Sequence, residues 1–298
     1  MAYINVYVST GANIFIKNKQ LYLQNKQLEQ TYPLEDVNSV IIENLQTTIT
    51  TYTLSQFAKY KILCFVCDSS HLPTGVVLPF CNQYQTLTNY NYQTEIAKPL
   101  CKQLWKQIIE NKIKNQNYVL KYFKKEADLT FLQESVLSGD SNNNEAKASL
   151  IYFPNLFGVD FVRRNDADPI NAFLNYGYAI LRGFIARSIV AHGLMPFIGI
   201  FHANQFNQFN LADDLIEVFR PVVDMYVAKN FNSSVIMNSL TKAQIYNLVN
   251  CNILVDGNKY SISYAIELFV QSFQKSLKEG KNCLKTISLL PIEVHEYE

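Results

Sequence analysis

Residues 168–193 read DPINAFLNYGYAILRGFIARSIVAHG and predict the helix around which the rest of the chain packs. Asp168 followed by Pro169 is typical of an N-cap and first helical turn, and Gly193 suits the left-handed residue that ends a helix. Apolar residues occupy nearly every side of this helix, so we expect it to be buried at the centre of a helical domain. His192 falls in its last turn, near the negative end of the helix dipole, and we interpret it as structural.

Two arginines interrupt the apolar surface of this helix. Arg182 and Arg187 cannot stay unpaired in apolar surroundings, because burial of an uncompensated guanidinium group is costly. We therefore expect both to have acidic or phosphate partners.

Downstream, residues 199–224 read GIFHANQFNQFNLADDLIEVFRPVVD and contain one of the four histidines of the chain together with a group of acids. Asn210 with Asp213 three residues later has the spacing of a capping box, so a helix start is predicted there, with Asp213 serving its N-terminus. His202, ahead of such acids, could bind a metal ion for chemistry on phosphate. Acids in a first turn more often serve the helix dipole, and a single histidine is more often structural, so the spacing alone favours a structural role.

Glu217 is the acid of this stretch with the most unusual backbone setting. Asp214 and Glu217 are three residues apart and therefore share a face of the predicted helix. In an unbroken helix, Pro221 would leave the Glu217 carbonyl without its amide donor. The sequence thus predicts a kink or break beside Glu217.

The first eighty residues favour strands. Runs at residues 14–16 and 21–23 flank a polar turn, as in a hairpin. Residues 81–93 are polar without a clear period, and from residue 94 onward the pattern is helical. The sequence therefore predicts an α+β chain of two domains, with a β-rich N-terminal domain over residues 1–80, a linker over 81–93 and a larger helical domain over 94–298.

Composition narrows the class of protein. The 298 residues are 48% hydrophobic and 17% charged, which indicates globular domains with sizeable cores. Neither a signal peptide nor an apolar run long enough to cross a bilayer is visible, so we expect a cytoplasmic protein with free thiols. Cys64 and Cys67 form a CxxC motif within an apolar run, and without a second pair we interpret them as core residues.

Lysines dominate residues 98–125, where eight of them accompany a single acid, Glu110, in a chain whose net charge is only +1. Four of these lysines are separated by multiples of four residues and predict a basic stripe along one helix face. Such a stripe is either a solvated face or an electrostatic footprint for nucleic acid, and the pattern favours neither. The four are Lys98, Lys102, Lys106 and Lys114.

Glu145 follows the turn-rich segment SGDSNNN at residues 138–144 and falls at a predicted helix start. A glutamate in a first turn is explained by the helix dipole. No role beyond the helix start follows from its local spacing.

Four separated stretches, in this order, resemble one family: the CRISPR-associated integrase that inserts new spacers, the Cas-one family, in its type II form. With the β-then-α layout, the resemblance covers nearly the whole chain. The stretches are CDSSHLPTGVVLP (67–79), NEAKASLIYFPNLFG (144–158), NAFLNYGYAILRGFIAR (171–187) and GIFHANQFNQFNLADDLIEVFRPVVD (199–224).

This resemblance implies a β-sandwich-like N-terminal domain and an all-α catalytic domain with a metal site. By motif, the catalytic metal ligands are Glu145, His202 and Glu217, with Asp214 as a further ligand or a support. Ala146 stands where the family often has glycine, which adds only a methyl group. Carboxylates with one imidazole suit Mg²⁺ or Mn²⁺.

The resemblance also implies a metal-dependent DNA endonuclease and integrase of CRISPR adaptation, acting in antiviral defence. Such an enzyme would join the 3′-hydroxyl ends of captured DNA fragments to the repeat by transesterification. The implied partners are double-stranded DNA, a second copy of the chain in a homodimer, the small second CRISPR adaptation protein and the type II effector nuclease.

In such an enzyme the basic stripe becomes an expected path for DNA phosphates. Further candidates for DNA contacts are arginines and tyrosines of the helical domain, and for the tyrosines core packing is an equal alternative. These candidates are Arg163, Arg164, Arg182, Arg187, Tyr176 and Tyr178.

The sequence leaves two other functions open. One is a non-catalytic DNA-binding scaffold whose acids serve only as helix caps. The other is a general structure-specific metal nuclease in DNA repair. Metal binding through His202 would argue against the scaffold, and repeat-directed integration would argue against the repair nuclease.

Overall fold

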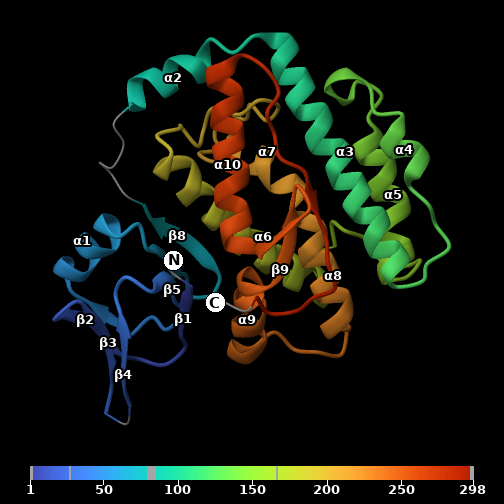
Figure 1. Ribbon diagram of the computed structural model, residues 1–298. Helices are drawn as coiled ribbons and strands as arrows, with labels where there is room; N and C mark the ends of the chain where they lie inside the picture. The colour runs from blue at the N-terminus through green and yellow to red at the C-terminus, as the bar shows by residue number, and fades with distance from the viewer. Residues whose placement is uncertain (1–2, 27, 79–84, 166, 296–298) are drawn as a thin grey trace.

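The computed structural model describes residues 3–26, 28–78, 85–165 and 167–295 and has a mixed α+β fold (Figure 1). Strands gather in the N-terminal part, drawn in blue, and helices make up most of the remainder. The α+β class predicted from the sequence is confirmed.

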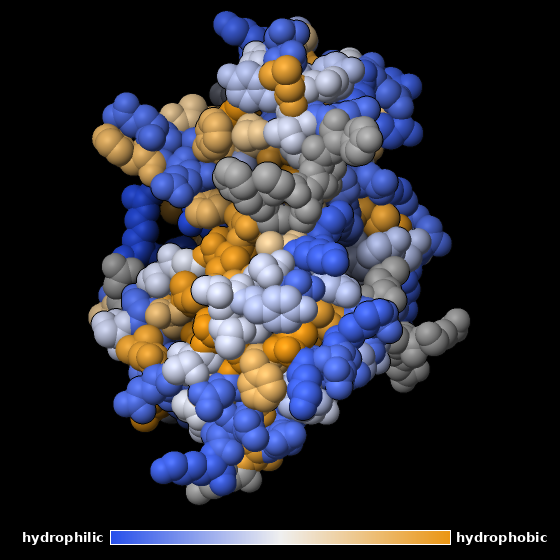
Figure 2. Space-filling view, turned by 90° about the vertical axis from the view of Figure 1, so that its left-hand side faces the viewer, coloured by the Kyte–Doolittle hydropathy of each residue, from blue (hydrophilic) through white to orange (hydrophobic). Residues whose placement is uncertain are grey.

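The surface is mixed in polarity. The face shown in Figure 2 presents apolar residues mainly in its middle part, between more hydrophilic regions above and below. In the described part of the chain, no helix is both long enough and apolar enough to cross a bilayer.

Within the described residues up to 78, the strands form two four-stranded sheets, one in the order β1-β5-β7-β8 and the other in the order β4-β3-β2-β6. The predicted hairpin is present, with Ile14 opposite Leu23, and its turn residues Asn18 and Lys19 both have positive φ. The strands are β1 (Ile4–Val8), β2 (Asn13–Lys17), β3 (Gln20–Gln24), β4 (Glu29–Pro33), β5 (Val37–Ile42), β6 (Thr48–Ile49), β7 (Leu63–Cys67) and β8 (Pro73–Val77).

Both sheets and helix α1 (Thr51–Lys59) share one apolar core. Ile14 of β2, Leu21 of β3, Val40 of β5 and Phe57 of α1 are buried in the same cluster. Because successive side chains of a strand point to opposite faces, each sheet can bury one face in this core.

Helices dominate from residue 85 onward and are joined by short 3-10 turns labelled η. They are α2 (Thr86–Thr94), α3 (Lys98–Tyr122), α4 (Thr130–Glu134), η1 (Ser138–Asp140), α5 (Asn144–Phe157), α6 (Pro169–Ala191), α7 (Asn210–Leu215), η2 (Ile216–Val218), α8 (Arg220–Asn230), α9 (Ser239–Tyr246), η3 (Asn247–Asn250) and α10 (Ile262–Glu279).

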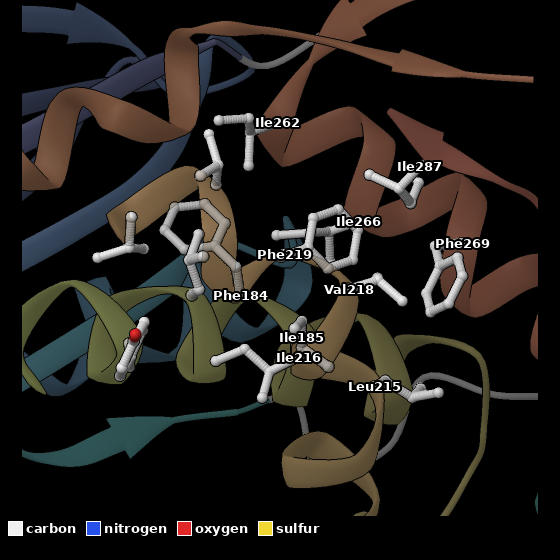
Figure 3. Close-up of a cluster of buried hydrophobic side chains, with 14 of the residues drawn as sticks. Phe184, Ile185, Leu215, Ile216, Val218, Phe219, Ile262, Ile266, Phe269 and Ile287 are labelled. Carbon is white, nitrogen blue, oxygen red and sulfur yellow. The ribbon is translucent and has the colours of Figure 1, made fainter. Parts of the chain in front are cut away.

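Helix α6 is the buried central helix that its sequence predicts. The Asp168 carboxylate accepts a hydrogen bond from the Ile170 amide at 2.8 Å, and Gly193 follows the helix with a φ of +70°. Figure 3 shows Phe184 and Ile185 of α6 among buried side chains of η2 and α10. The core of this part of the chain therefore forms around α6.

The second part is not helical throughout, contrary to the all-α expectation. Its described residues include a three-stranded sheet of β9 (Asn252–Val255), β10 (Asn258–Ser261) and β11 (Ile287–Ser288), in the order β10-β9-β11. Strands this short show no clear sequence period. The turn Asp256-Gly257, with both residues at positive φ, is nevertheless a strong hairpin signal that the helical interpretation overlooked.

Helix α2 occupies most of the predicted linker. Residues 81–84 lie outside the described residues, but 86–94 are helical. Asn89 donates to the His192 carbonyl at 3.0 Å, and Gln93 accepts from the Met195 amide at 2.7 Å. These buried amides dock α2 on the segment after α6, which explains how a polar stretch without an apolar period forms a helix.

The N-terminal sheet that contains β5 and β7 meets the helical part along α6. Gly183 allows close approach to β7, because a Cβ there would lie 2.2 Å from Cε1 of Phe65. The buried Arg187 donates to the backbone and side-chain oxygens of Asn38, at 2.9 and 2.7 Å. The hydrogen-bond partner of Arg187 is therefore an asparagine, not the acid or phosphate that was expected.

Candidate active site

Glu145 lies in the first turn of α5, as predicted, but it does not cap the helix. The Asp140 carboxylate does so, accepting from the amides of Asn144 at 2.8 Å and of Glu145 at 3.1 Å. This leaves the Glu145 side chain free to turn away from its own helix.

Glu217 lies in a break between helices, as its neighbour Pro221 predicts. Helix α7 ends at Leu215, η2 contains Glu217, and α8 begins at Arg220 with Pro221 in its first turn. Arg220 Nε donates to Glu217 Oε1 at 2.8 Å, and the Glu217 side chain is only 7% exposed. The break thus holds an acid inside the protein rather than on a helix surface.

Lys112 of α3 joins the two glutamates. Its Nζ lies 2.5 Å from Glu145 Oε1 and 2.5 Å from Glu217 Oε2. Since both oxygens contact the same nitrogen, they are at most twice 2.5 Å, or 5.0 Å, apart. The structure therefore brings together two of the three predicted ligands.

The charges of this cluster stabilise one another. Burial alone would raise the pKa of Glu217, but Arg220 and Lys112 outweigh burial and lower it to about 2. Burial alone would lower the pKa of Lys112, but the two glutamates outweigh burial and raise it. Both groups are therefore ionised near neutral pH.

His202 lies in the segment between α6 and α7 and is held by Asp214. Its Nδ1 lies 2.7 Å from Asp214 Oδ1, and the hydrogen bond to this carboxylate raises the pKa of His202 against the opposing effect of burial. Because a carboxylate can only accept, the neutral ring carries its proton on Nδ1 and directs the Nε2 lone pair away from Asp214.

Asp214 is fully buried and acts as a support for this segment. Besides the His202 ring, its two oxygens accept from the amides of Ile200, Phe201 and His202 at 2.7, 3.1 and 3.0 Å. Gly199 permits this arrangement, since a Cβ there would lie 2.7 Å from Asp214 Oδ2 and 2.3 Å from the His202 carbonyl oxygen. Of the two roles expected for Asp214, the geometry fits the support.

Helix α7 begins at Asn210 with Asp213 in its first turn, as predicted, but the predicted capping hydrogen bonds are not made. Asp213 Oδ2 accepts from Arg182 at 2.9 Å and from the Asn207 side chain at 2.6 Å. The Asn210 side chain likewise donates to the carbonyls of Phe197 and Asn204 instead of capping. The mostly exposed loop ahead of α7 supplies partners for both side chains, and Arg182 gains the acidic partner expected for it.

Two cavities adjoin these groups. One, of about 990 Å³, is lined by Lys112, Glu145 and Glu217, and the other, of about 370 Å³, is lined by His202. Arg163, Tyr178 and Arg220 line both cavities, which are therefore adjacent. Within the described ranges, no three His, Cys, Asp or Glu side chains are close enough together to hold a metal ion.

Comparison with known proteins identifies the family of this chain. Residues 6–244 match the family model of CRISPR associated protein Cas1. The chain is 36% identical, over 100% of both sequences, to the CRISPR-associated endonuclease Cas1 of Neisseria meningitidis serogroup C, strain 8013. The chain belongs to the Cas1 family. The predicted resemblance and the predicted class, an endonuclease and integrase of CRISPR adaptation, are confirmed.

Solved structures share the Cas1 fold. A casposase bound to integration product matches with a TM-score of 0.76 at 19% identity, over 95% of this chain and 92% of that one. A Cas6-RT-Cas1–Cas2 complex matches with a TM-score of 0.69 at 17% identity, over 94% of this chain and 35% of that one. At these identities the likeness concerns the fold.

Several candidate DNA contacts in this Cas1-family chain are at the surface. Lys98, Lys102, Lys114 and Arg164 are exposed, and Lys106 is half-buried beside Glu110. Arg163 and Arg182 line the cavities described above.

Three of the predicted DNA contacts are buried in the structure. Tyr176 is 2% exposed within the core and Arg187 is buried against Asn38, so neither is placed to contact DNA. Tyr178 is largely buried and its hydroxyl donates to the Asp224 carboxylate, but it lines both cavities and so stays a candidate. The apolar neighbours of these side chains on α6 explain their burial.

Sequence reasoning missed Lys112, which was counted only among the lysines of a basic helix. A signal was available: Leu104, Ile108, Lys112, Gln116 and Leu120 share one i, i+4 row, which is mostly apolar and is buried. A lysine in such a buried row requires a partner of opposite charge. Arg220 and Asp224 lie within the stretch 199–224, but their local spacing indicates no role for them.

Proposed function

We propose that Glu145, Glu217 and His202 form the metal-binding active site of this Cas1-family enzyme. We further propose that the enzyme joins 3′-hydroxyl ends of captured DNA to the CRISPR repeat. The observation that supports this most is the meeting of two carboxylates from distant segments at one cation, beside a cavity that also has arginines in its wall.

The residues present fit a hard divalent cation. The Lys112 ammonium, placed between two carboxylates, stands in for such an ion. Glu217 Oε2 is buried, and the Lys112 ammonium, 2.5 Å away, is the cation beside it. Oxygen ligands with one imidazole suit Mg²⁺ or Mn²⁺, which Glu145, Glu217 and His202 Nε2 would hold.

In the proposed reaction the 3′-oxygen of the fragment forms a bond to a phosphorus atom of the repeat. The bond from that phosphorus to the 3′-oxygen of the repeat breaks, and the proton lost by the attacking hydroxyl is balanced by one gained at the leaving oxygen. A bound metal ion supplies Lewis-acid stabilisation of the phosphate and a lower pKa for the attacking hydroxyl. Arg163 and Arg220, in the cavity wall, place positive charge beside the phosphate.

Partners follow from the same proposal. A solved complex with this fold contains Cas2 with Cas1, and a casposase of this fold is bound to an integration product. These support double-stranded DNA and the small second CRISPR adaptation protein as partners of this chain. A homodimer and contact with the type II effector nuclease stay predictions from the resemblance.

The test is joining of a labelled duplex to a repeat-containing plasmid in Mg²⁺ or Mn²⁺. We expect His202→Ala and Glu217→Ala to abolish joining and Lys259→Ala, at an exposed lysine remote from the cavities, to leave it intact. Retained joining in either active-site variant, from a wild type that is active, would refute the assignment. Joining to plasmids without a repeat at equal rate would favour the repair nuclease instead.

Metal titration distinguishes the proposed enzyme from a non-catalytic DNA-binding scaffold. We expect Mn²⁺ to raise the thermal unfolding temperature of the wild type and to raise that of His202→Ala less. An equal shift in both proteins would indicate that His202 is no ligand.

A further inference from the structure

Lys112 places an ammonium group where a cation held by the two glutamates would lie. Its side chain is 7% exposed, and Nζ is 2.5 Å from one oxygen of each acid. Protein oxygens hold Mg²⁺ at about 2.0–2.1 Å. An ion bound to these same two oxygens would therefore come close to the ammonium nitrogen, and the two cations cannot occupy that space together.

We propose that Lys112 is a resident cation that competes with the divalent metal ion for Glu145 and Glu217. The inference rests on the proposed function, because it takes these acids as metal ligands. Without metal, the ammonium holds two like-charged carboxylates together. With metal, it moves out of the position between them.

Charge balance requires this movement. The formal charges of Glu145, Glu217, Lys112 and Arg220 cancel, so the cluster is neutral before a metal ion enters. A divalent ion added beside a stationary ammonium would place like charges in contact in a buried site, which is strongly unfavourable. Arg220 need not move, because it binds the other oxygen of Glu217, Oε1.

The cavity next to the cluster gives the displaced ammonium a place to go. Lys112 lines the space of about 990 Å³ together with Gln116, Ser149 and both glutamates. A lysine side chain has a flexible four-carbon stem, so its ammonium can turn into this space without a shift of α3. Lys112 is thus a positioning residue: its ammonium group holds the two glutamates together until the metal ion binds and displaces it.

The first test is calorimetric binding of Mn²⁺ by the full chain. We expect Lys112→Gln to bind Mn²⁺ at least about tenfold more tightly than the wild type, the factor that one charge-assisted hydrogen bond can contribute. Lys106→Gln is the matched control, since Lys106 lies on the same helix and pairs with Glu110 at 3.5 Å outside the site. Equal or weaker binding by Lys112→Gln overturns the proposal.

A third variant, Glu145→Gln, separates this inference from the proposed function. If it weakens Mn²⁺ binding while Lys112→Gln does not strengthen it, the proposed site stands and the competition is refuted. If Glu145→Gln leaves Mn²⁺ binding unchanged, or if neither the wild type nor any variant binds Mn²⁺, the proposed metal site is refuted. The proposed competition is then refuted with it.

A second measurement needs only the wild type, in case Lys112→Gln does not fold. Acetylation by acetic anhydride, followed by peptide mass spectrometry, reports the access of each lysine. We expect saturating Mn²⁺ to speed the labelling of Lys112 at least about threefold, because an ammonium released from two charge-assisted contacts reacts more readily, while labelling of Lys106 stays constant. Unchanged or slower labelling of Lys112 with Mn²⁺ overturns the proposal.

Discussion

Gly199 is the residue whose missing side chain allows the His202 segment to close over Asp214. We expect Gly199→Ala to destabilise the protein by about 1–3 kcal/mol, because the added methyl group must displace backbone and carboxylate atoms. Urea denaturation measures this cost. Gly11→Ala, where a Cβ meets only ordinary contacts from 3.5 Å outward, is the control, and an equal effect of both changes would contradict the argument.

Asp224 gives the stability of the protein a pH dependence. Burial raises its pKa to about 6 from an ordinary 3.8, although the hydrogen bond from Tyr178 acts in the opposite direction. Between these values the folded protein binds a proton that the unfolded chain releases, so this contribution is largest at low pH and is lost as the pH rises towards 6.

We therefore expect Asp224→Asn to gain stability relative to the wild type as the pH rises from 4 to 7. The gain is at most about 3 kcal/mol, and an asparagine oxygen can still accept from Tyr178. Urea denaturation at pH 4.5 and pH 7 measures the difference. A difference that is constant between the two pH values would contradict a raised pKa for Asp224.

At the scale of single residues, sequence patterns predicted roles only where the backbone itself leaves a signature. The break at Glu217 followed from Pro221, and the start of α5 at Glu145 followed from the turn before it. Lys112 contacts Glu145 and Glu217, and Asp214 contacts His202. These contacts join a helix to distant segments or to a loop, and local residue spacing does not predict them. The family resemblance named Glu145, His202 and Glu217, but not the lysine between the two glutamates.

At the scale of elements, α3 holds the broken helix in place. The Asn115 side chain, almost fully buried, donates to the carbonyls of Val218 and Ile287 at 3.1 and 3.2 Å. Val218 ends η2, where the break leaves carbonyls without helical donors. One asparagine thus joins α3, the segment of Glu217 and β11.

We expect Asn115→Ala to cost about 1–3 kcal/mol of stability, since it leaves buried carbonyls unsatisfied. DNA joining should fall with it, because Glu217 lies next to Val218. Gln103→Ala, at an exposed position of the same helix, should change the free energy of unfolding by less than about 0.5 kcal/mol. Urea denaturation compares the two, and equal costs would refute the role of Asn115.

Long elements were more predictable than short ones. The 23-residue α6 has an apolar pattern that stands out in the sequence. Helix α2 and the sheet around β9 instead depend on docking against other parts of the chain, through Gln93 and through pairing with β11. Tertiary contacts of this kind have no periodic signature.

At the scale of the whole molecule, the basic stripe on α3 is expected to bind DNA backbone. We expect replacement of its four lysines by glutamine to weaken DNA binding and to reduce the slope of log affinity against log salt by about 3–4, because each phosphate contact contributes about 0.9. Fluorescence anisotropy at several salt concentrations measures both quantities. The stripe consists of Lys98, Lys102, Lys106 and Lys114.

The control removes equal charge elsewhere. A variant with four surface lysines of the C-terminal part replaced by glutamine should keep the wild-type slope. If both variants behave alike, the stripe is an ordinary solvated face. The control lysines are Lys259, Lys275, Lys278 and Lys281.

Neighbouring residues of α6 touch the two halves of the molecule. Arg182 binds Asp213 in the wall of the His202 cavity, and Gly183, next in the chain, presses against Phe65 of the N-terminal sheet. Because packed interiors transmit small displacements, a shift of α6 at this turn displaces atoms both in the wall of the His202 cavity and in the N-terminal sheet. We therefore expect a fluorinated phenylalanine at position 65 to change its ¹⁹F chemical shift when DNA enters the His202 cavity, although residue 65 does not line that cavity.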